Sequence, residues 1–161
     1  AMQREDGAWR YGTLPHHGFV DSFHTGFNIE ALDLIRKTLG TGEFDSTIFR
    51  GLAYYRENFF SPDGMVKYYD NNVYPLDMHS VAQAILVFLS LGQGSGDRAL
   101  AQRVLTWAID HLYNMPKGRF YYQATRFWKN SIDYARWTQA WSYYALAAFN
   151  NREKNEYGVT G

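Results

Sequence analysis

The feature that most constrains the fold of this chain is a sequence pattern that recurs three times at a nearly constant spacing. The copies read VDSFHTGFNIEAL, LDMHSVAQAILVF and IDYARWTQAWSYY, each with an aspartate in front of an apolar run. Corresponding amides lie at Asn28, Gln83 and Gln139, which are separated by 55 and 56 residues. Self-similarity at such a period is typical of repeat architectures, in which each unit buries its apolar face against its neighbours.

Each unit predicts the same order of elements. A glycine turn and an alternating aromatic stretch predict a short strand, over 65–69 and over 119–123. The DNN that follows Tyr69 predicts a hairpin turn. Helices that begin at an aspartate are predicted over 21–39, 77–91 and 133–150. Helices with an apolar stripe at three- and four-residue spacing are predicted over 46–60 and 97–114. The aspartate-led helices are apolar nearly all round, which indicates an inner layer that the striped helices cover.

The pairing of an inner with an outer helix predicts the fold class. We expect an all-α protein of repeated αα-hairpins that form part of an α/α toroid, with short β-hairpins in the connections. Residues 1–6 are predicted to be a tag remnant and a disordered start, because the opening Ala1-Met2 is typical of a cloning remnant. The partial toroid is predicted over 7–150, as three repeats of about 55 residues, and a flexible polar tail over 151–161.

Composition and the absence of certain motifs exclude several classes of function. Sixteen basic residues balance sixteen acidic ones, so the chain has no charge bias towards nucleic acid or an anionic membrane. No apolar run approaches the ~20 residues of a membrane span, and no secretion signal is visible, so we expect a cytoplasmic location. The sequence has no Cys, no HExxH-type ligand spacing, no phosphate-binding glycine loop and no dinucleotide fingerprint. Neither a metal nor a cofactor is therefore expected.

Three aspartates occupy equivalent positions in the units: Asp21, Asp77 and Asp133. One interpretation is that all three are helix N-caps, whose carboxylates accept hydrogen bonds from backbone N–H groups. The other is that the helix starts converge on one mouth, where a ring of carboxylates performs acid–base chemistry or binds sugar hydroxyls. The two interpretations remain open and can apply to different members.

Further polar side chains are expected at the same mouth. Two histidines lie a helical turn from the amides of their units, which places each pair on one helix face, while the third unit offers an arginine instead. A histidine on an apolar helix is either a satisfied core residue or a proton carrier. The polar residues in question are His24, Asn28, His79, Gln83, Arg136 and Gln139, together with His17 in a nearby loop.

Aromatic residues make up 18% of the chain, which is more than a core of this size needs. Many of them surround the predicted helix starts, where they either pack between loops and helix ends or stack on sugar rings. The set contains Trp9, Tyr11, Tyr68, Tyr69, Tyr121, Tyr122, Trp137 and Trp141. Of these, we expect Tyr11, Tyr68, Trp137 and Trp141 to bind a substrate.

The stretches FVDSFHTGFNIEAL, YPLDMHSVAQAI and RWTQAWSYYALA resemble bacterial proteins of the α/α-toroid superfamily that are found with polysaccharide biosynthesis. These proteins are similar in architecture to six-hairpin glycosidases, N-acylglucosamine 2-epimerases and uronyl hydrolases. The resemblance covers residues 7 to 150 and implies an active cleft at one end of the inner helices, at Asp21, His24, Asp77, His79, Asp133 and Arg136. Some relatives carry the label delta-aminolevulinic acid dehydratase. Such an enzyme is a βα-barrel with Schiff-base lysines, whereas this sequence shows no βα alternation.

The leading hypothesis is a carbohydrate-active domain that acts on a bacterial polysaccharide or oligosaccharide, with Asp21, His24, Asp77 and His79 as catalytic residues. In a hydrolytic version two of the aspartates act as acid and base. In an elimination or epimerisation the two histidines exchange protons at a sugar carbon while Arg136 binds a carboxylate. The alternatives are a non-catalytic glycan-binding or assembly module and a purely structural repeat.

The resemblance also predicts a partner. A closed toroid of this kind has six hairpins, whereas the sequence predicts two complete hairpins and the inner helix of a third. The apolar flank QAWSYYALAAF is then left without an outer helix, and exposed patches of that kind mark interfaces. We therefore expect a missing N-terminal half of a longer chain, or a second copy, to cover it.

Overall fold

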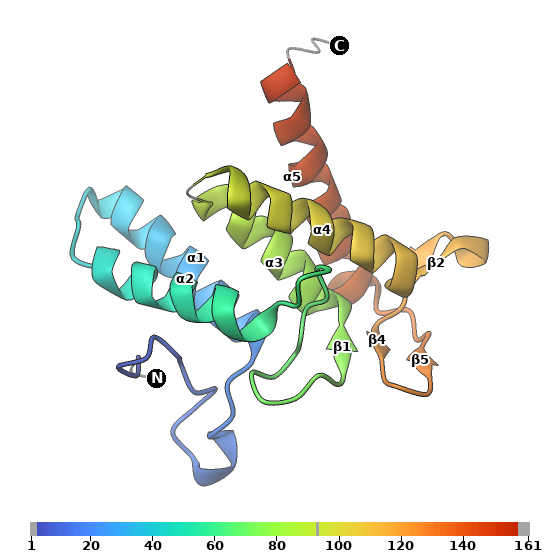
Figure 1. Ribbon diagram of the computed structural model, residues 1–161, viewed down its shortest axis with the longest axis horizontal. Coiled ribbons are helices and arrows are strands. Elements are labelled where there is room, and N and C mark those ends of the chain that lie inside the picture. Colours follow the sequence, from blue (N-terminus) through green and yellow to red (C-terminus); the bar gives the residue numbers. More distant parts are fainter. Residues whose placement is uncertain (1–2, 93, 158–161) are drawn as a thin grey trace.

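The computed structural model of the chain describes residues 3–92 and 94–157, and this part is mostly helical. It contains five α-helices and a few two-residue strands, without a central β-sheet (Figure 1). The helices are α1 (Ser22–Leu39), α2 (Asp45–Phe59), α3 (Met78–Leu91), α4 (Ser95–Leu112) and α5 (Ala140–Tyr157). None of the described helices has the length and apolar character needed to cross a membrane.

The prediction of five main helices is confirmed, and the bounds of the first four agree to within two residues. The last one differs. It begins with a π-helical turn, Ala135–Gln139, and α5 then continues to Tyr157, so residues 151–157 of the predicted tail are helical. At the other end, Ala1 and Met2 lie outside the described residues. Gln3, in the predicted disordered start, pairs with Trp9 and donates to the Thr47 carbonyl in α2 over 2.9 Å.

Helix α3 lies at the centre of the molecule. Helices α1, α4 and α5 pack against it, and α2 packs on α1. Twelve of the fourteen residues of α3 are buried, as its nearly continuous apolar sequence predicts. The predicted inner layer is therefore fully realised in α3, whereas α1 and α5 contact α3 on one side and keep exposed faces. Figure 1 shows α5 rising away from the other helices towards the C-terminus.

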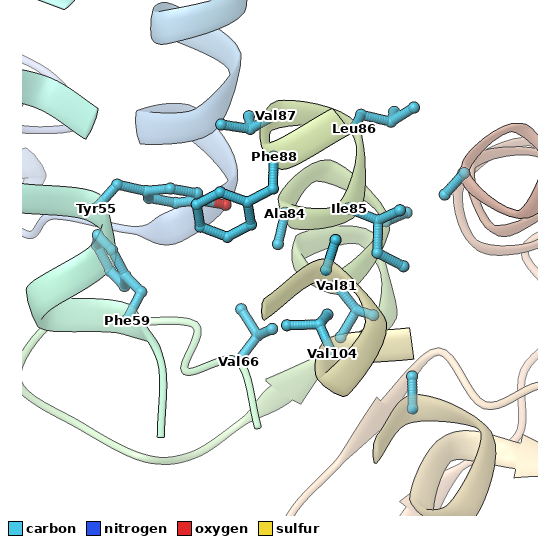
Figure 2. Packing of buried hydrophobic residues seen from close by; sticks show 14 of the residues in the cluster. Tyr55, Phe59, Val66, Val81, Ala84, Ile85, Leu86, Val87, Phe88 and Val104 are labelled. Atoms are coloured by element: carbon cyan, nitrogen blue, oxygen red, sulfur yellow. The ribbon is translucent and has the colours of Figure 1, made fainter. Parts of the chain in front are cut away.

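Part of the core is a cluster of side chains between α2, α3 and α4 (Figure 2). Tyr55 of α2 contacts Phe59 of the same helix and Phe88 of α3, while Val66 from the connecting loop lies near Val104 of α4. These five side chains are at most 2% exposed, and burying a residue of this kind contributes about 1.5–3 kcal/mol. The cluster fixes α3 against both outer helices.

Two glycines place the connecting loops against the outer helices. Gly7 and Gly64 have φ angles of 95° and 99°, which glycine adopts without strain. The N–H of each donates to the carbonyl three residues earlier, forming the same type of turn. A Cβ at Gly7 would collide with the Arg50 carbonyl of α2, and one at Gly64 with the Arg103 carbonyl of α4. Each turn therefore packs directly on a helix backbone.

The short strands connect the helix starts. Strands β1 (Leu76–Asp77), β4 (Gln123–Ala124) and β5 (Lys129–Asn130) form an antiparallel sheet in the order β1-β4-β5. Strand β2 (Tyr113–Asn114) pairs with β3 (Arg119–Phe120). The single strand predicted over 119–123 is thus divided between two sheets. The β1–β4 register sets Asp77 opposite Gln123, which positions the site described below.

Candidate functional site

An open cavity of about 440 Å³ lies at the N-terminal ends of α1 and α3. The strand β1, the loop before α1 and the π-helical turn before α5 contribute to its wall. Six of the predicted site residues meet there: Tyr11, His24, Tyr68, Asp77, His79 and Trp137. The sequence analysis did not single out Phe23 or Tyr134, and it assigned Tyr122 no binding role, although all three line the cavity.

Asp21 and His24 form a hydrogen-bonded pair at this cavity. The buried Asp21 carboxylate caps α1, where its Oδ1 accepts from the His24 backbone N–H over 2.8 Å. Its Oδ2 lies 2.9 Å from Nδ1 of the same histidine. Since an ionised carboxylate offers only acceptors, Nδ1 carries the proton of this bond. The neutral ring then has its lone pair on Nε2, and Asp21 stabilises the imidazolium that forms when Nε2 accepts a proton.

Asp77 caps α3 and is held from two sides. Its Oδ1 accepts from the His79 backbone N–H over 2.8 Å, and its Oδ2 accepts from Nε2 of Gln123 over 2.7 Å. Burial raises the pKa of the Asp77 carboxyl, although these hydrogen bonds oppose that shift. The residue is 3% exposed and lines the cavity. It is therefore a carboxyl group poised to accept a ligand hydrogen bond or to exchange a proton.

His79 is enclosed by aromatic rings. Its ring stacks on Phe23 with a centroid distance of 3.9 Å and meets the edges of Trp137 and Trp141 at 5.6 and 4.8 Å. Burial in this apolar setting lowers the pKa of His79 to about 4, so its ring is neutral at pH 7. Its Nε2 is buried and has no hydrogen-bond partner among the described residues.

Aromatic side chains make up most of the remaining wall. Tyr11 stacks on Phe19 at 4.8 Å and meets His24 edge-on at the same centroid distance. Tyr122 and Tyr134 meet at 4.8 Å on the other side. Burial raises the pKa of Tyr68, which keeps its hydroxyl protonated as a donor. A wall of this kind presents flat apolar faces and hydroxyl groups together.

The predicted amide residues lie outside the cavity. Gln83 is fully buried between helices, where it donates to Glu30 of α1. Gln139 binds the backbone of Phe120 in β3, accepting from its N–H over 3.1 Å and donating to its carbonyl over 2.9 Å. Asn28 lies on α1, one turn after His24, and does not line the cavity. Gln83 thus joins α3 to α1 through the Glu30 side chain, and Gln139 joins the π-helical turn to β3 through the Phe120 backbone.

The prediction that all three aspartates begin helices is wrong for Asp133. It is exposed, and its carboxylate binds Arg119 instead of capping α5. The π-helical turn begins after Tyr134, whose side chain makes no capping bond. The ion pair with Arg119 draws the carboxylate towards β3 and away from the helix start. Asp133 therefore does not join Asp21 and Asp77 at the cavity.

Three other predicted residues lie beside the cavity but do not line it. Arg136 is exposed on the π-helical turn. His17 contacts Tyr11 edge-on at 5.1 Å. Trp141 packs behind the wall, against Phe23 and His79, and lines a second cavity of about 410 Å³ between α1 and α5.

Two of the missed residues, Phe23 and Gln123, depend on contacts between segments that are distant in the sequence. Phe23 lies between two predicted site residues, yet its role depends on stacking with His79 from another helix. Gln123 reaches Asp77 through the two-residue pairing of β1 with β4, which is too short to leave a sequence pattern. The proximity of Tyr134 to Asp133 was the available signal for that residue.

Within the described part of the chain, no three His, Asp or Glu side chains are grouped so as to hold a metal ion. No protein-family model matches the chain, and a search of curated proteins gives no match either. The chemistry of the cavity is therefore the basis on which a function is assigned.

Proposed function

We propose that this chain is a carbohydrate-active domain that works on a saccharide of bacterial polysaccharide biosynthesis by Asp/His acid–base chemistry. The observation that carries the proposal is the Asp21–His24 pair, with a bond of 2.9 Å, at the wall of a cavity lined mainly by aromatic rings. Flat rings suit the apolar faces of a sugar, while hydroxyl and carboxyl groups suit its hydroxyls.

In the proposed mechanism His24 is the general base. Its Nε2 accepts a proton from a sugar hydroxyl, a sugar carbon or a water molecule, and Asp21 orients the ring and stabilises the charge. Asp77, whose carboxyl pKa is raised by burial, lines the same cavity and is the candidate residue for delivering a proton. The neutral His79 keeps Phe23 and the two tryptophans in place. These roles serve hydrolysis, elimination or epimerisation.

We also propose that the helices belong to an α/α toroid. The turns at Gly7 and Gly64, each packed on the backbone of an outer helix, support a repeated hairpin unit. The caps at Asp21 and Asp77 support it further, because each is followed by a helix that packs on the next helix and on the next but one: α1 on α2 and α3, and α3 on α4 and α5. In such an array the cavity lies where the inner helices begin.

A panel of oligosaccharides tests this proposal through turnover and binding. We expect His24→Gln to lower turnover of a responsive substrate by about 10²–10⁴-fold, the usual contribution of a general base, while binding changes by less than about threefold. Asp133→Asn is the matched control, because this aspartate is exposed and lies outside the cavity. Turnover that survives His24→Gln unchanged would remove the assigned mechanism.

The second candidate is a non-catalytic glycan-binding or assembly module. The hydrogen bonds of Asp77 favour it, since both carboxylate oxygens already accept from groups of the chain itself. This alternative predicts saturable binding of an oligosaccharide without any turnover. It also predicts that His24→Gln leaves the dissociation constant unchanged while Trp137→Leu weakens binding, because only stacking would matter.

A further inference from the structure

The charges around the cavity indicate which sugars it accepts. Among the described residues that line it, the acidic one is Asp77, and neither Arg nor Lys is present. A second carboxylate, Asp21, lies directly behind His24. The cavity therefore presents the carboxyl group of Asp77 to a ligand, with the Asp21 carboxylate close behind its wall and no Arg or Lys among its described lining residues.

Three cations from the segments around the cavity, Arg119, Lys129 and Arg136, do not line it. Arg119 binds Asp133, and Lys129 lies 5.2 Å from the centre of the Tyr121 ring. Arg136, the residue expected to bind a sugar carboxylate, is exposed and does not line the cavity. A uronate in this cavity would thus meet carboxylates without an arginine to bind it.

The two carboxylates already repel one another. The charge on Asp21 adds to the burial that raises the pKa of Asp77. Burial raises the pKa of Tyr68, which lines the same cavity, and both carboxylates raise it further. A negatively charged ligand would increase this repulsion, whereas a positive charge would relieve it.

The aromatic wall adds a second preference for positive charge. Six of the nine lining residues are Phe, Tyr or Trp. The face of such a ring attracts a cation, and recognition of ammonium groups by several rings together is a common use of this attraction. His24 contributes a lone pair at Nε2, because its Nδ1 proton is bound to Asp21. An ammonium group would therefore find carboxylate, ring faces and an acceptor nitrogen in one cavity.

We propose that the cavity selects a sugar that carries a protonated amine, such as a hexosamine unit, over its N-acetylated counterpart and over uronates. This inference rests on the carbohydrate function proposed above. The amine lies near Asp77 and the ring faces, while the remaining hydroxyls bond to His24 and the tyrosines.

The test compares three probes by calorimetry on the whole chain at about pH 7, where an amine of this kind is largely protonated. The probes are a glucosamine trisaccharide, the same trisaccharide fully N-acetylated, and a trisaccharide of glucuronate. We expect the amine form to bind at least about tenfold more tightly than the N-acetylated form, and the uronate to bind least tightly. Raising the salt concentration should weaken the amine form alone.

Asp77→Asn tests the assigned residue, since asparagine still caps a helix. The preference for the amine should fall to within about twofold, with Asp133→Asn as the unchanged control. If Asp77→Asn does not fold, Trp137→Leu takes its place and should weaken binding of the amine form about threefold or more.

The outcomes separate this inference from the proposed function. Equal binding of the amine and N-acetylated forms, or tighter binding of the uronate, overturns the amine preference and leaves a carbohydrate site. If none of the sugars binds while choline binds in an Asp77-dependent way, the proposed function and the amine-sugar inference are both overturned.

Discussion

At the residue scale, the spacing between aspartate and histidine decides what each histidine does. His24 follows Asp21 by three residues, so its ring reaches back to the same carboxylate that caps the helix. His79 follows Asp77 by two residues, and only its backbone N–H reaches the cap, while its ring enters the aromatic cluster. One additional residue therefore separates a histidine equipped to carry a proton from one that is held neutral.

The neutral state of His79 predicts a pH dependence of stability. Burial lowers the pKa of His79 from 6.5 to about 4. Between pH 6.5 and 4 this histidine therefore binds a proton in the unfolded chain but not in the folded chain. The contribution of the neutral His79 to the free energy of unfolding is fully present above pH 6.5. This contribution falls by about 3 kcal/mol as the pH decreases towards 4. We expect urea unfolding to show that the free energy of unfolding falls more steeply over this interval in the parent than in His79→Phe. Parallel curves for the two proteins would contradict the assignment.

The structural roles of these polar residues could be predicted from the sequence to different degrees. Asp21 and Asp77 were correctly predicted as caps, because a cap depends only on local backbone and a short side chain. Gln139 lies outside the cavity, and the partner of its amide is the backbone of Phe120, 19 residues away. Contacts of that kind depend on how a loop packs, which a single sequence does not encode in its periodicity.

At the element scale, the connecting turns are as restrictive as the helices. Gly64 combines a φ of 99° with a position at which an added Cβ would lie 2.5 Å from the Arg103 carbonyl of α4. The turn leads on to Val66 and the core cluster, so displacing it disturbs α3 as well as α4.

Gly64→Ala is therefore expected to destabilise the fold by at least about 2 kcal/mol, from the unfavourable φ and the displaced helix backbone. Gly96→Ala is the matched control. Gly96 lies in the first turn of α4, and a Cβ there meets nothing within 4 Å, so the change should be neutral or stabilise by up to about 1 kcal/mol. Thermal unfolding measures both. Equal effects of the two substitutions would show that the contact with α4 is unimportant.

The helices themselves were predictable because their patterns are local. Glycines between the paired helices and apolar periodicity indicate the bounds of α1 to α4, and aspartate caps mark the starts of α1 and α3. The start of α5 was predicted wrongly because Asp133 binds Arg119, a residue of β3. The sheet order β1-β4-β5 was out of reach, since strands of two residues carry no alternation to read.

At the scale of the whole molecule, α3 is surrounded while α1 and α5 are each covered on one side. Ala145 and Phe149 of α5 are buried in the core, whereas Tyr144 is 59% exposed. On α1, Leu34 is 66% exposed. Leu34 and Tyr144 line the same cavity between α1 and α5. We refer to Phe27, Leu34, Trp141 and Tyr144 as the α1–α5 groove.

An apolar groove between two helices is a surface that another helix fills well. We therefore expect the chain to self-associate, with a second copy covering the α1–α5 groove, and the sedimentation coefficient to rise with protein concentration. The double substitution Leu34→Ser with Tyr144→Ser should shift this self-association to concentrations at least about tenfold higher, because it removes exposed apolar area from the groove. Phe127→Ser is the control: Phe127 is 86% exposed between β4 and β5 and does not line the groove, so its loss should change nothing. A monomer at every concentration would contradict this prediction, as would an equal effect of Phe127→Ser.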